Sequence, residues 1–491
     1  MGHERQALER ALEHALAHLE SLDSSSVGAT ATLEDLRRAL ARPLPDRGTP
    51  APRVVDELVA DAAGGLLGSQ GGRFFSWVIG GSLPAAMAAD WLTTAWDQNA
   101  GIHACSPAAS VVEEVAGSWL KELFGLPPEA SFAFVTGTQM AHVTCLAAAR
   151  HAVLARHGWN VERQGLTGAP RVRILASADR HGSVDRALRL LGFGTDGIEA
   201  LPIDGAGQVN RQTLEAGLSR SGGPAIVVLQ AGELNAGAFD PFEELAPLAR
   251  EAGAWTHVDA AFGLWARVSP AHAHRAKGIE LCDSWTTDGH KYLNVPYDSG
   301  FAFVRDAAAH RAAMTLSTSY LPPGGQARDE LDWNPEFSRR ARAFPVYAAV
   351  RELGREGLAE LVERTCRHAH ALVTRIGGLP GAELVATRGF NQGLVRFRAP
   401  GPHATEGDHD RRTDAVIAAI NASGEALFGG VTWRGRRAMR ISVCNWRTSE
   451  ADVDRAVAAA RAAAAVPQEQ VRGAPDAHQG GESDASGRRR P

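Results

Sequence analysis

A lysine and an aspartate that lie 32 positions apart (259 and 291) are the first candidates for chemistry in this sequence. Lys291 stands in the run DGHKY at 288–292, and Asp259 stands in the run HVDAA at 257–261. A lysine amine forms an imine with a carbonyl compound. A carboxylate can pair with a pyridinium nitrogen and keep it protonated, which makes the ring an electron sink. Together the two residues indicate a site for a carbonyl cofactor.

Two further motifs fit such a site. Thr136, Gly137 and Thr138 stand between an apolar run and a helical pattern, and free N–H groups at a helix start bind anions such as phosphate. His181 follows another apolar run, and an imidazole can stack on a flat ring. Each motif is weak alone, because a strand-to-helix turn, a lone histidine or an aspartate that caps a strand end is common in any fold.

The middle of the chain alternates short apolar runs with helical patterns, which predicts how these residues meet. The runs, rich in Val, Ile and Phe, are at 132–136, 172–177, 225–230, 255–259 and 300–304. Helical patterns lie between most of them, at 140–154, 183–191 and 241–251. This alternation predicts an α/β fold with a mostly parallel central sheet and helices on both faces. Ligands bind at the carboxyl ends of such strands, where the candidate residues stand.

The flanking segments predict a division into four parts. The first is an N-terminal helical segment over 1–105, with helices at 4–22 and 85–97 and a proline-rich linker at 43–53. A large domain over 106–345 follows, its first helix opened by the Ser-Pro pair at 106–107. A small α/β domain over 346–465 carries a long helix at 344–376, strands near 394–397 and 439–443 and a last helix at 450–464, and we expect a disordered tail over 466–491.

Composition narrows the class of protein. The 491 residues carry a formal net charge of -5, so no basic field favours nucleic acid or an anionic membrane. The five cysteines are scattered without metal-binding spacing, which predicts reduced thiols, no metal site and a cytoplasmic location. The charged N-terminus lacks the apolar core of a signal peptide, and no apolar run is long enough to predict a membrane span.

In this order along the chain, the four motifs resemble the group II pyridoxal phosphate (PLP) decarboxylases, which include the aromatic-L-amino-acid and glutamate decarboxylases. The resemblance runs from about residue 73 to about residue 464. Its carriers are RFF at 73–75, SPA at 106–108, the run at 181, HVDAA at 257–261 and HKYL at 290–293. It implies a type I aminotransferase-like PLP fold and a homodimer with active sites at the subunit interface.

The resemblance also implies roles for individual residues. Lys291 would hold PLP as a Schiff base, Asp259 would pair with the ring nitrogen, and His181 would stack on the ring as a catalytic residue. Ala261 would lie against the opposite face of the ring. The remaining cofactor-binding residues, mostly at the phosphate, would be Thr136, Gly137, Thr138, Gln230, Thr287 and His290.

Substrate-side residues follow from the same resemblance. Tyr320 falls where the aromatic branch carries a loop tyrosine that protonates the substrate carbon, although an ordinary loop tyrosine is the alternative. Phe74, Phe75 and Trp77 would form a substrate wall, although core packing explains the two phenylalanines equally well. The segment 97–103, with Asn99 and His103, would reach the neighbouring subunit's pocket.

Two departures from the family bear on this interpretation. The phosphate turn is often Gly-Gly followed by Ser or Thr in relatives, but it reads Gly137-Thr138-Gln139 here, and His142 replaces a later asparagine.

The predicted reaction is decarboxylation of an L-amino acid to its amine, with aromatic substrates favoured and glutamate or 2,4-diaminobutyrate open. The alternatives are an oxidative deaminase that yields an aldehyde, an aminotransferase, and a non-catalytic PLP-fold binding protein.

Overall fold

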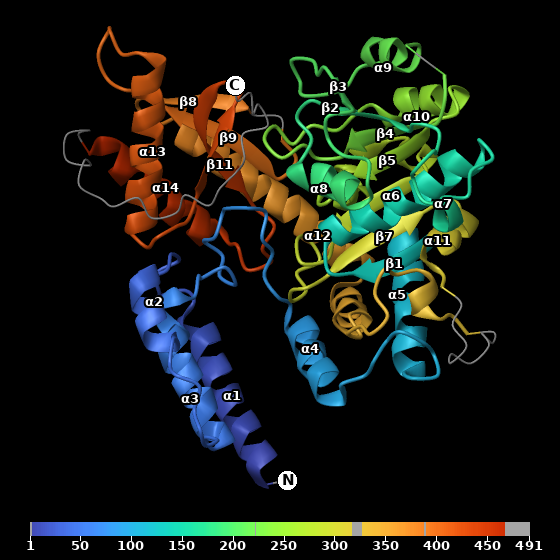
Figure 1. Ribbon diagram of the computed structural model, residues 1–491. Helices are drawn as coiled ribbons and strands as arrows, with labels where there is room; N and C mark the ends of the chain where they lie inside the picture. The colour runs from blue at the N-terminus through green and yellow to red at the C-terminus, as the bar shows by residue number, and fades with distance from the viewer. Residues whose placement is uncertain (1, 221, 317–326, 387–388, 467–491) are drawn as a thin grey trace.

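The computed structural model describes residues 2–220, 222–316, 327–386 and 389–466, and its centre is a seven-stranded sheet (Figure 1). The strand order is β1-β7-β6-β5-β4-β2-β3, in which β7 runs antiparallel to both of its neighbours and the other pairs are parallel. The strands are β1 (Ser131–Val135), β2 (Arg173–Ser177), β3 (Ile198–Leu201), β4 (Ala225–Gln230), β5 (Trp255–Asp259), β6 (Ser284–Asp288) and β7 (Gly300–Val304). The predicted α/β class with a mostly parallel sheet is confirmed.

Alternate residues of each central strand face two separate apolar clusters, one on each side of the sheet. In β4, Ile226 and Val228 pack into one cluster, while Val227 and Leu229 pack into the other. A strand side chain alternates between faces, so both faces must be covered to bury such a run. The first face is covered by α6 (Thr138–Ala155), α8 (Gly182–Leu190) and α11 (Ala307–Met314). The second is covered by α5 (Pro107–Phe124), α10 (Phe242–Glu251) and the first part of α12 (Ala343–Gly377).

The second unit is a four-stranded antiparallel sheet with the order β10-β11-β9-β8. Its strands are β8 (Ala382–Ala386), β9 (Gln392–Phe397), β10 (Gly429–Trp433) and β11 (Arg436–Ser442). The later part of α12, α13 (Glu406–Ala422) and α14 (Glu450–Ala465) pack on it. The predicted boundary at 345–346 falls in the first turn of α12, and the domain limits stay a prediction.

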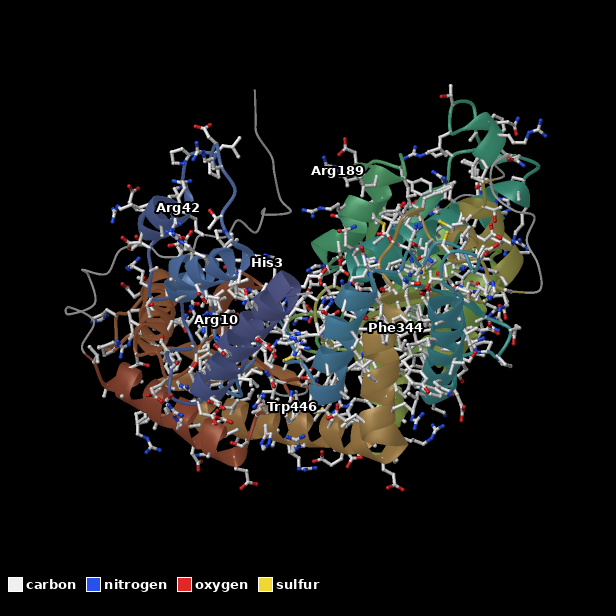
Figure 2. All side chains as sticks on the ribbon, turned by 90° about the horizontal axis from the view of Figure 1, so that it is seen from below. His3, Arg10, Arg42, Arg189, Phe344 and Trp446 are labelled. Atoms are coloured by element: carbon white, nitrogen blue, oxygen red, sulfur yellow. The ribbon has the colours of Figure 1, made fainter. Side chains whose placement is uncertain are left out.

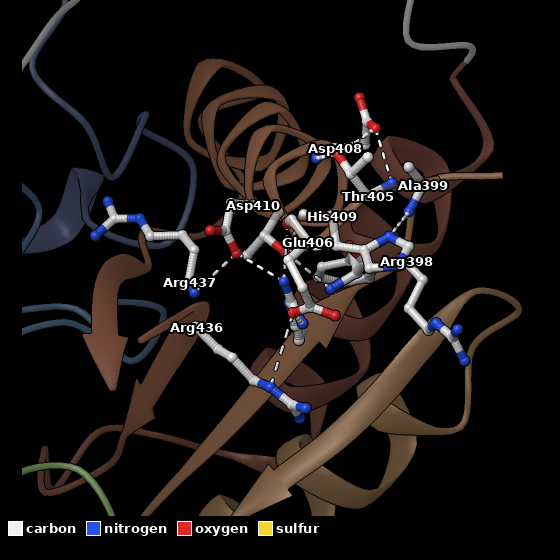
Figure 3. Close-up of polar contacts among 12 residues, drawn as sticks. Arg398, Ala399, Thr405, Glu406, Asp408, His409, Asp410, Arg436 and Arg437 are labelled. Carbon is white, nitrogen blue, oxygen red and sulfur yellow. Dashed lines mark hydrogen bonds and ion pairs between the residues drawn. The ribbon is translucent and has the colours of Figure 1, made fainter. Parts of the chain in front are cut away.

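Charged side chains tie α13 to the sheet of the second unit. Asp410 on α13 accepts a hydrogen bond from the backbone N–H of Arg437 on β11 at 3.0 Å (Figure 3). The same Asp410 oxygen accepts from Nη2 of Arg396 on β9 at 2.7 Å, and Arg396 also pairs with Glu406 at 2.7 Å. Because Arg396 is buried, hydrogen-bonded carboxylates must replace the water that its guanidinium loses.

The N-terminal helices project from the body of the molecule (Figure 1). They are α1 (Gly2–Ser21), α2 (Leu33–Leu40) and α3 (Ala51–Ala62), and α4 (Pro84–Trp96) follows against α12. Arg10 and His14 of α1 both contact Asp56 of α3, at 2.7 Å each, and Figure 2 shows Arg10 on the exposed α1. The predicted linker at 43–53 ends earlier than expected, because α3 begins at residue 51.

Two smaller sets of elements complete the described chain. The helix α7 (Val161–Gln164) packs against α6, and α9 (Arg211–Leu218) packs against β3 and α10. Short 3-10 turns occur at Ala63–Gly65, Gly263–Val268, Ala273–Ala276, Ile279–Leu281 and Glu330–Asp332. Among the described residues, none of the helices combines the length and the apolar character that crossing a bilayer requires.

A buried ion pair fastens the segment after residue 327 to the large domain. Arg339 donates two hydrogen bonds to the Glu113 carboxylate, at 2.8 and 3.2 Å, and both side chains are fully buried. Arg339 also donates to the carbonyl of Phe134 at 2.6 Å. Nearby Glu330 is buried beside Glu113 and pairs with Arg328 at 2.9 Å. Burial, followed by the negative charge of Glu113, raises the pKa of Glu330 well above its usual value.

Replacing Arg339 with alanine should therefore lower the free energy of unfolding by about 3–5 kcal/mol, because it leaves Glu113 buried without its counter-charge. Urea denaturation followed by tryptophan fluorescence would measure the change. The matched control is Arg355→Ala, which breaks an exposed pair with Glu122 and should cost less than about 1 kcal/mol. Equal losses for the two variants would contradict the role assigned to Arg339.

Candidate active site

The candidate site lies at the carboxyl edge of the large sheet, where register aligns its residues. Gln230, the last residue of β4, pairs with Asp259, the last residue of β5, and Asp259 pairs with Thr286 of β6. In β5, Trp255 packs into the cluster beneath α6 and Val258 packs into the opposite cluster. Because side chains alternate along a strand, Asp259 faces the same side as Trp255, toward α6.

The predicted phosphate turn begins α6 and lies against the lysine run. Gly137 is the N-cap of α6, and a side-chain carbon added to it would lie 3.4 Å from the His290 ring. The backbone N–H of Thr138 donates to Asp288 at 2.6 Å. The Thr138 hydroxyl is buried and makes no hydrogen bond within the described chain. The structure thus brings the predicted turn and the predicted lysine motif to one place.

Lys291 forms an ion pair with Asp288, with 3.0 Å between Nζ and the carboxylate. Burial alone would raise the pKa of Asp288, but the charges of Lys291 and His290 and the Thr138 hydrogen bond outweigh it and lower that pKa below its usual value. The Lys291 amine also lies 5.8 Å from the centre of the Phe262 ring. Of the three lysines in the sequence, Lys121 bonds to loop carbonyls and Lys277 pairs with a surface glutamate.

The turn that presents Lys291 is fixed by Asn294. Its backbone φ is 51°, in the left-handed region that asparagine tolerates better than most residues. Its side-chain oxygen accepts from Gly81 N and Trp446 N, at 2.7 and 2.9 Å. Its side-chain nitrogen donates to two carbonyls, both at 2.9 Å. Gly80 supports the same turn, because a side-chain carbon there would lie 2.0 Å from the Lys291 carbonyl oxygen.

His181 lies at the start of α8, where its conformation is fixed by capping. Its Nδ1 accepts a hydrogen bond from Ser183 N at 3.2 Å and lies 2.7 Å from the Ser183 hydroxyl. The side chain is exposed, and its imidazole interacts electrostatically with both Asp259 and Lys291. Four of the predicted elements, namely the phosphate turn, His181, Asp259 and Lys291, therefore surround one location.

Asp259 is buried and ionised. One of its oxygens accepts from Ala261 N at 3.3 Å, and the other lies 3.5 Å from Nε2 of His142. Burial alone would raise the pKa of Asp259, but the neighbouring His142 first, and then the charges of His181 and Lys291, lower that pKa below the usual value. A carboxylate that stays ionised at the end of a strand can pair with a protonated ring nitrogen.

The contacts of several other predicted residues do not test their roles, which stay predictions. The Thr287 hydroxyl donates to the carbonyl of Ala261 at 3.2 Å. Asn99 accepts hydrogen bonds from Gly101 N and Arg339 N, and the backbone N–H of His103 donates to Asp329. Both lie on the segment that follows α4. Tyr320 lies outside the described residues.

The predicted aromatic wall is divided between core and surface. Phe75 is fully buried in the core of the second unit, where its ring stacks on Phe428 with 5.2 Å between centres. Phe74 is buried against Leu427, whereas Trp77 is 52% exposed. Core packing therefore accounts for the burial of both phenylalanines, and contact with a substrate stays a prediction for all three residues.

A lysine, a buried carboxylate and a histidine at the carboxyl edge of this sheet are the residues expected of a PLP enzyme of the aminotransferase fold type. Comparisons agree with that class. Residues 34–400 match the family described as "Pyridoxal-dependent decarboxylase conserved domain". Since this match covers most of the chain, the protein belongs to the pyridoxal-dependent decarboxylase family. PLP is its cofactor, and it is a PLP-dependent carboxy-lyase.

Individual relatives span several substrates. An L-2,4-diaminobutyrate decarboxylase of Rhizobium meliloti (strain 1021) is 30% identical, over 74% of this chain and 72% of that protein. An aromatic-L-amino-acid decarboxylase of Bacillus atrophaeus is 26% identical, over 91% and 92%. A 4-hydroxyphenylacetaldehyde synthase of Rhodiola rosea is 27% identical, over 71% and 72%. The solved structure of Oryza sativa TDC with PLP and tryptamine is 25% identical, with a TM-score of 0.87 over 94% of this chain and 97% of that one.

The donor set at the site fits PLP. The buried polar atoms without a hydrogen-bond partner within the described protein include Thr138 Oγ1, Gln230 Nε2 and His290 Nδ1. Buried polar groups normally have partners, so these atoms are suited to bind the phosphate and the polar substituents of the ring. Asp288 adds a negative charge beside the phosphate turn, which the paired Lys291 balances.

Sequence reasoning missed several residues of this site. Asp288 stands in the lysine run, but the sequence does not show that this carboxylate lies beside the phosphate turn. Asn294 carries no motif, and its importance appears only from three hydrogen bonds to distant segments and a fourth to nearby Tyr292. His142 stands where relatives carry an asparagine, and this departure is the sequence signal that points to its position beside Asp259.

Borohydride reduction of the PLP-loaded protein should attach the cofactor to Lys291 alone, because this lysine is the one at the site. Peptide mass spectrometry would locate the label. Lys291→Ala should abolish the labelling completely, while Lys277→Ala, which changes a surface pair, should leave it unchanged. Label on Lys121 or Lys277 in the unaltered protein would refute the assignment.

Proposed function

We propose that this protein removes the carboxylate of an L-amino acid as CO₂ and releases the corresponding amine, with aromatic amino acids as the favoured substrates. The observation that carries the proposal is the convergence of Lys291, Asp259 and His181 at one edge of the sheet. Family membership supports the type of reaction. The names of the relatives leave the substrate class open, because they include aromatic and diaminobutyrate decarboxylases.

Bound PLP would supply an electron-withdrawing ring that stabilises the electron pair left on Cα when the carboxylate departs. Asp259 would bind the ring nitrogen and hold the proton on it. His181 and Ala261 would confine the ring between them. Lys291 would hold the cofactor between turnovers, and its ion pair with Asp288 would keep the amine in place when the substrate amine displaces it.

A proton must reach Cα after CO₂ leaves, and three residues are candidates to deliver it. Tyr320 is our first choice, with Lys291 or His181 as substitutes. His181 accepts a hydrogen bond from Ser183 N at its Nδ1, so in its neutral form the ring proton lies on Nε2, where it can be donated. The competing reactions are oxidative deamination to an aldehyde, as the name of the Rhodiola rosea relative suggests, and transamination.

The purified PLP-loaded protein should release CO₂ and form an amine from at least one member of a panel of the twenty standard amino acids, 2,4-diaminobutyrate and other common non-protein amino acids. The amine should be identified by mass spectrometry, and an aromatic member should give the highest kcat/KM. Lys291→Ala, with the cofactor added, is the negative control. No CO₂ from any member despite bound cofactor would overturn the proposal.

The same assay with Tyr320→Phe separates decarboxylation from its nearest rival. Loss of amine and gain of aldehyde is the expected result, because Cα then lacks its proton donor. Unchanged amine formation would assign the proton to Lys291 or His181. A protein that binds PLP but turns over no panel member in any reaction would instead support the non-catalytic binding role.

We also propose a homodimer that functions in the cytoplasm. Leu8, Leu12 and Leu16 of α1 recur at four-residue spacing and are 64%, 44% and 49% exposed. A helical stripe of this kind on a projecting hairpin is suited to pack against a second copy. Trp91 and Trp96 of α4 are also exposed, at 42% and 49%, and offer a second apolar surface.

Light scattering coupled to size exclusion should give the mass of two 52.0 kDa chains. The double variant Leu8→Asp/Leu12→Asp should shift the protein toward monomer, since it places charge on the apolar stripe. Leu44→Asp is the matched control, because Leu44 is 94% exposed in a loop outside the stripe. A monomeric unaltered protein would refute the dimer.

A further inference from the structure

A chain of three hydrogen bonds runs through the sheet toward the carboxylate at its edge. Trp255 Nε1 lies 2.9 Å from Ser284 Oγ, which lies 2.9 Å from Nδ1 of His257. The other nitrogen of His257, Nε2, lies 2.8 Å from Nδ1 of His142. Nε2 of His142 then lies 3.5 Å from the Asp259 carboxylate.

These residues meet because of strand alternation and helix placement. Trp255, His257 and Asp259 occupy alternate positions of β5 and so share its α6 face. Ser284 pairs with His257 in the register of β6. His142 lies in the second turn of α6, directly over that face.

The carboxylate sets the direction of the last bond in the chain. Trp255 Nε1 can only donate, and an ionised carboxylate can only accept, so Asp259 requires a proton on Nε2 of His142. When His142 carries this proton alone, its Nδ1 accepts from Nε2 of His257, and Nδ1 of His257 accepts from the Ser284 hydroxyl. The four side chains from Trp255 to His142 then form one line of donors that ends at Asp259.

Burial of these polar side chains is unfavourable unless each of them has a hydrogen-bond partner. His142, His257 and Ser284 are all fully buried, and a buried imidazole without partners loses its hydration. Burial, followed by the neighbouring His142, lowers the pKa of His257 well below its usual value, which keeps His257 neutral, as the direction of the bonds requires. Apart from Asp259, Nε2 of His142 has no partner within the described chain.

We propose that His142 is a positioning residue that donates a hydrogen bond from Nε2 to Asp259 and so orients this carboxylate toward the ring nitrogen of PLP. His257 and Ser284 hold His142 in the tautomer that this bond requires. The proposal rests on Asp259 binding that nitrogen. Ala261 N engages the other oxygen of Asp259, so two donors fix the plane of the carboxylate. Enough acceptor sites remain on the carboxylate for the ring N–H.

The test uses the PLP-loaded protein and three variants. His142→Leu removes the donor and should weaken PLP binding about tenfold or more, since hydrogen bonds to a buried charge are strong. His142→Gln places a side-chain N–H near the position of Nε2 and should restore most of the affinity. Ser284→Ala releases the far end of the chain and should weaken PLP binding less than His142→Leu does. Combining Ser284→Ala with His142→Leu should weaken PLP binding no further than His142→Leu alone.

The matched control is His310→Leu. His310 is equally buried and also bonds at both nitrogens, to Ser131 and to the Trp333 carbonyl, but it has no link to Asp259. It should lose comparable stability and keep the PLP affinity. The ratio of the absorption bands of bound PLP at one fixed pH is a second readout, which should change in His142→Leu and recover in His142→Gln.

Each outcome decides the proposal separately from the proposed function. An unchanged PLP dissociation constant and unchanged bands in folded His142→Leu would overturn the role of His142, even if the protein decarboxylates amino acids. If His142→Leu does not fold, an unchanged PLP dissociation constant and unchanged absorption bands in folded Ser284→Ala would still overturn the tautomer argument. Failure of the unaltered protein to release CO₂ bears on the reaction alone.

Discussion

The pairing register of β4, β5 and β6 is the constraint on which the rest of the site depends. It places Gln230, Asp259 and Thr286 side by side at one edge, and it directs Asp259 toward α6. A slip of one residue in β5 would turn Asp259 toward the opposite, apolar cluster and bring Val258 to the cofactor side. Burying an unpaired carboxylate is unfavourable, and Trp255 and Val258 pack into their two clusters in this register. Both effects therefore select the register that forms the site.

Charge balance is the second requirement, because the site gathers two carboxylates in a buried region. Asp288 is balanced by Lys291, and Asp259 is balanced by surrounding donors. This separation has a chemical consequence. In the proposed reaction, the carboxylate beside Lys291 would retain an amine that leaves and rejoins the cofactor, while Asp259 would stay ionised at the ring nitrogen. One kind of side chain performs two tasks because its neighbours differ.

Sequence patterns predicted the strands best where burial on both faces demanded continuous apolar runs. The runs at 225–230, 255–259 and 300–304 coincide with β4, β5 and β7. In contrast, β6 reads Ser-Trp-Thr-Thr-Asp and β3 reads Ile-Glu-Ala-Leu, so polar residues hid both strands. Lys291, Asp259 and His181 were found from residue type and order. Asp288 and Asn294 were not, because their importance depends on contacts between segments that no local pattern records.

Asn294 shows why the lysine turn cannot be understood from the large domain alone. Its side chain bonds Gly81, which precedes α4, and Cys444 and Trp446, which follow the last strand of the second unit. Three distant parts of the chain therefore meet at a buried residue three positions after Lys291. A shift of the second unit relative to the large sheet would break these bonds and move the amine, so the fit between the units also determines where Lys291 lies.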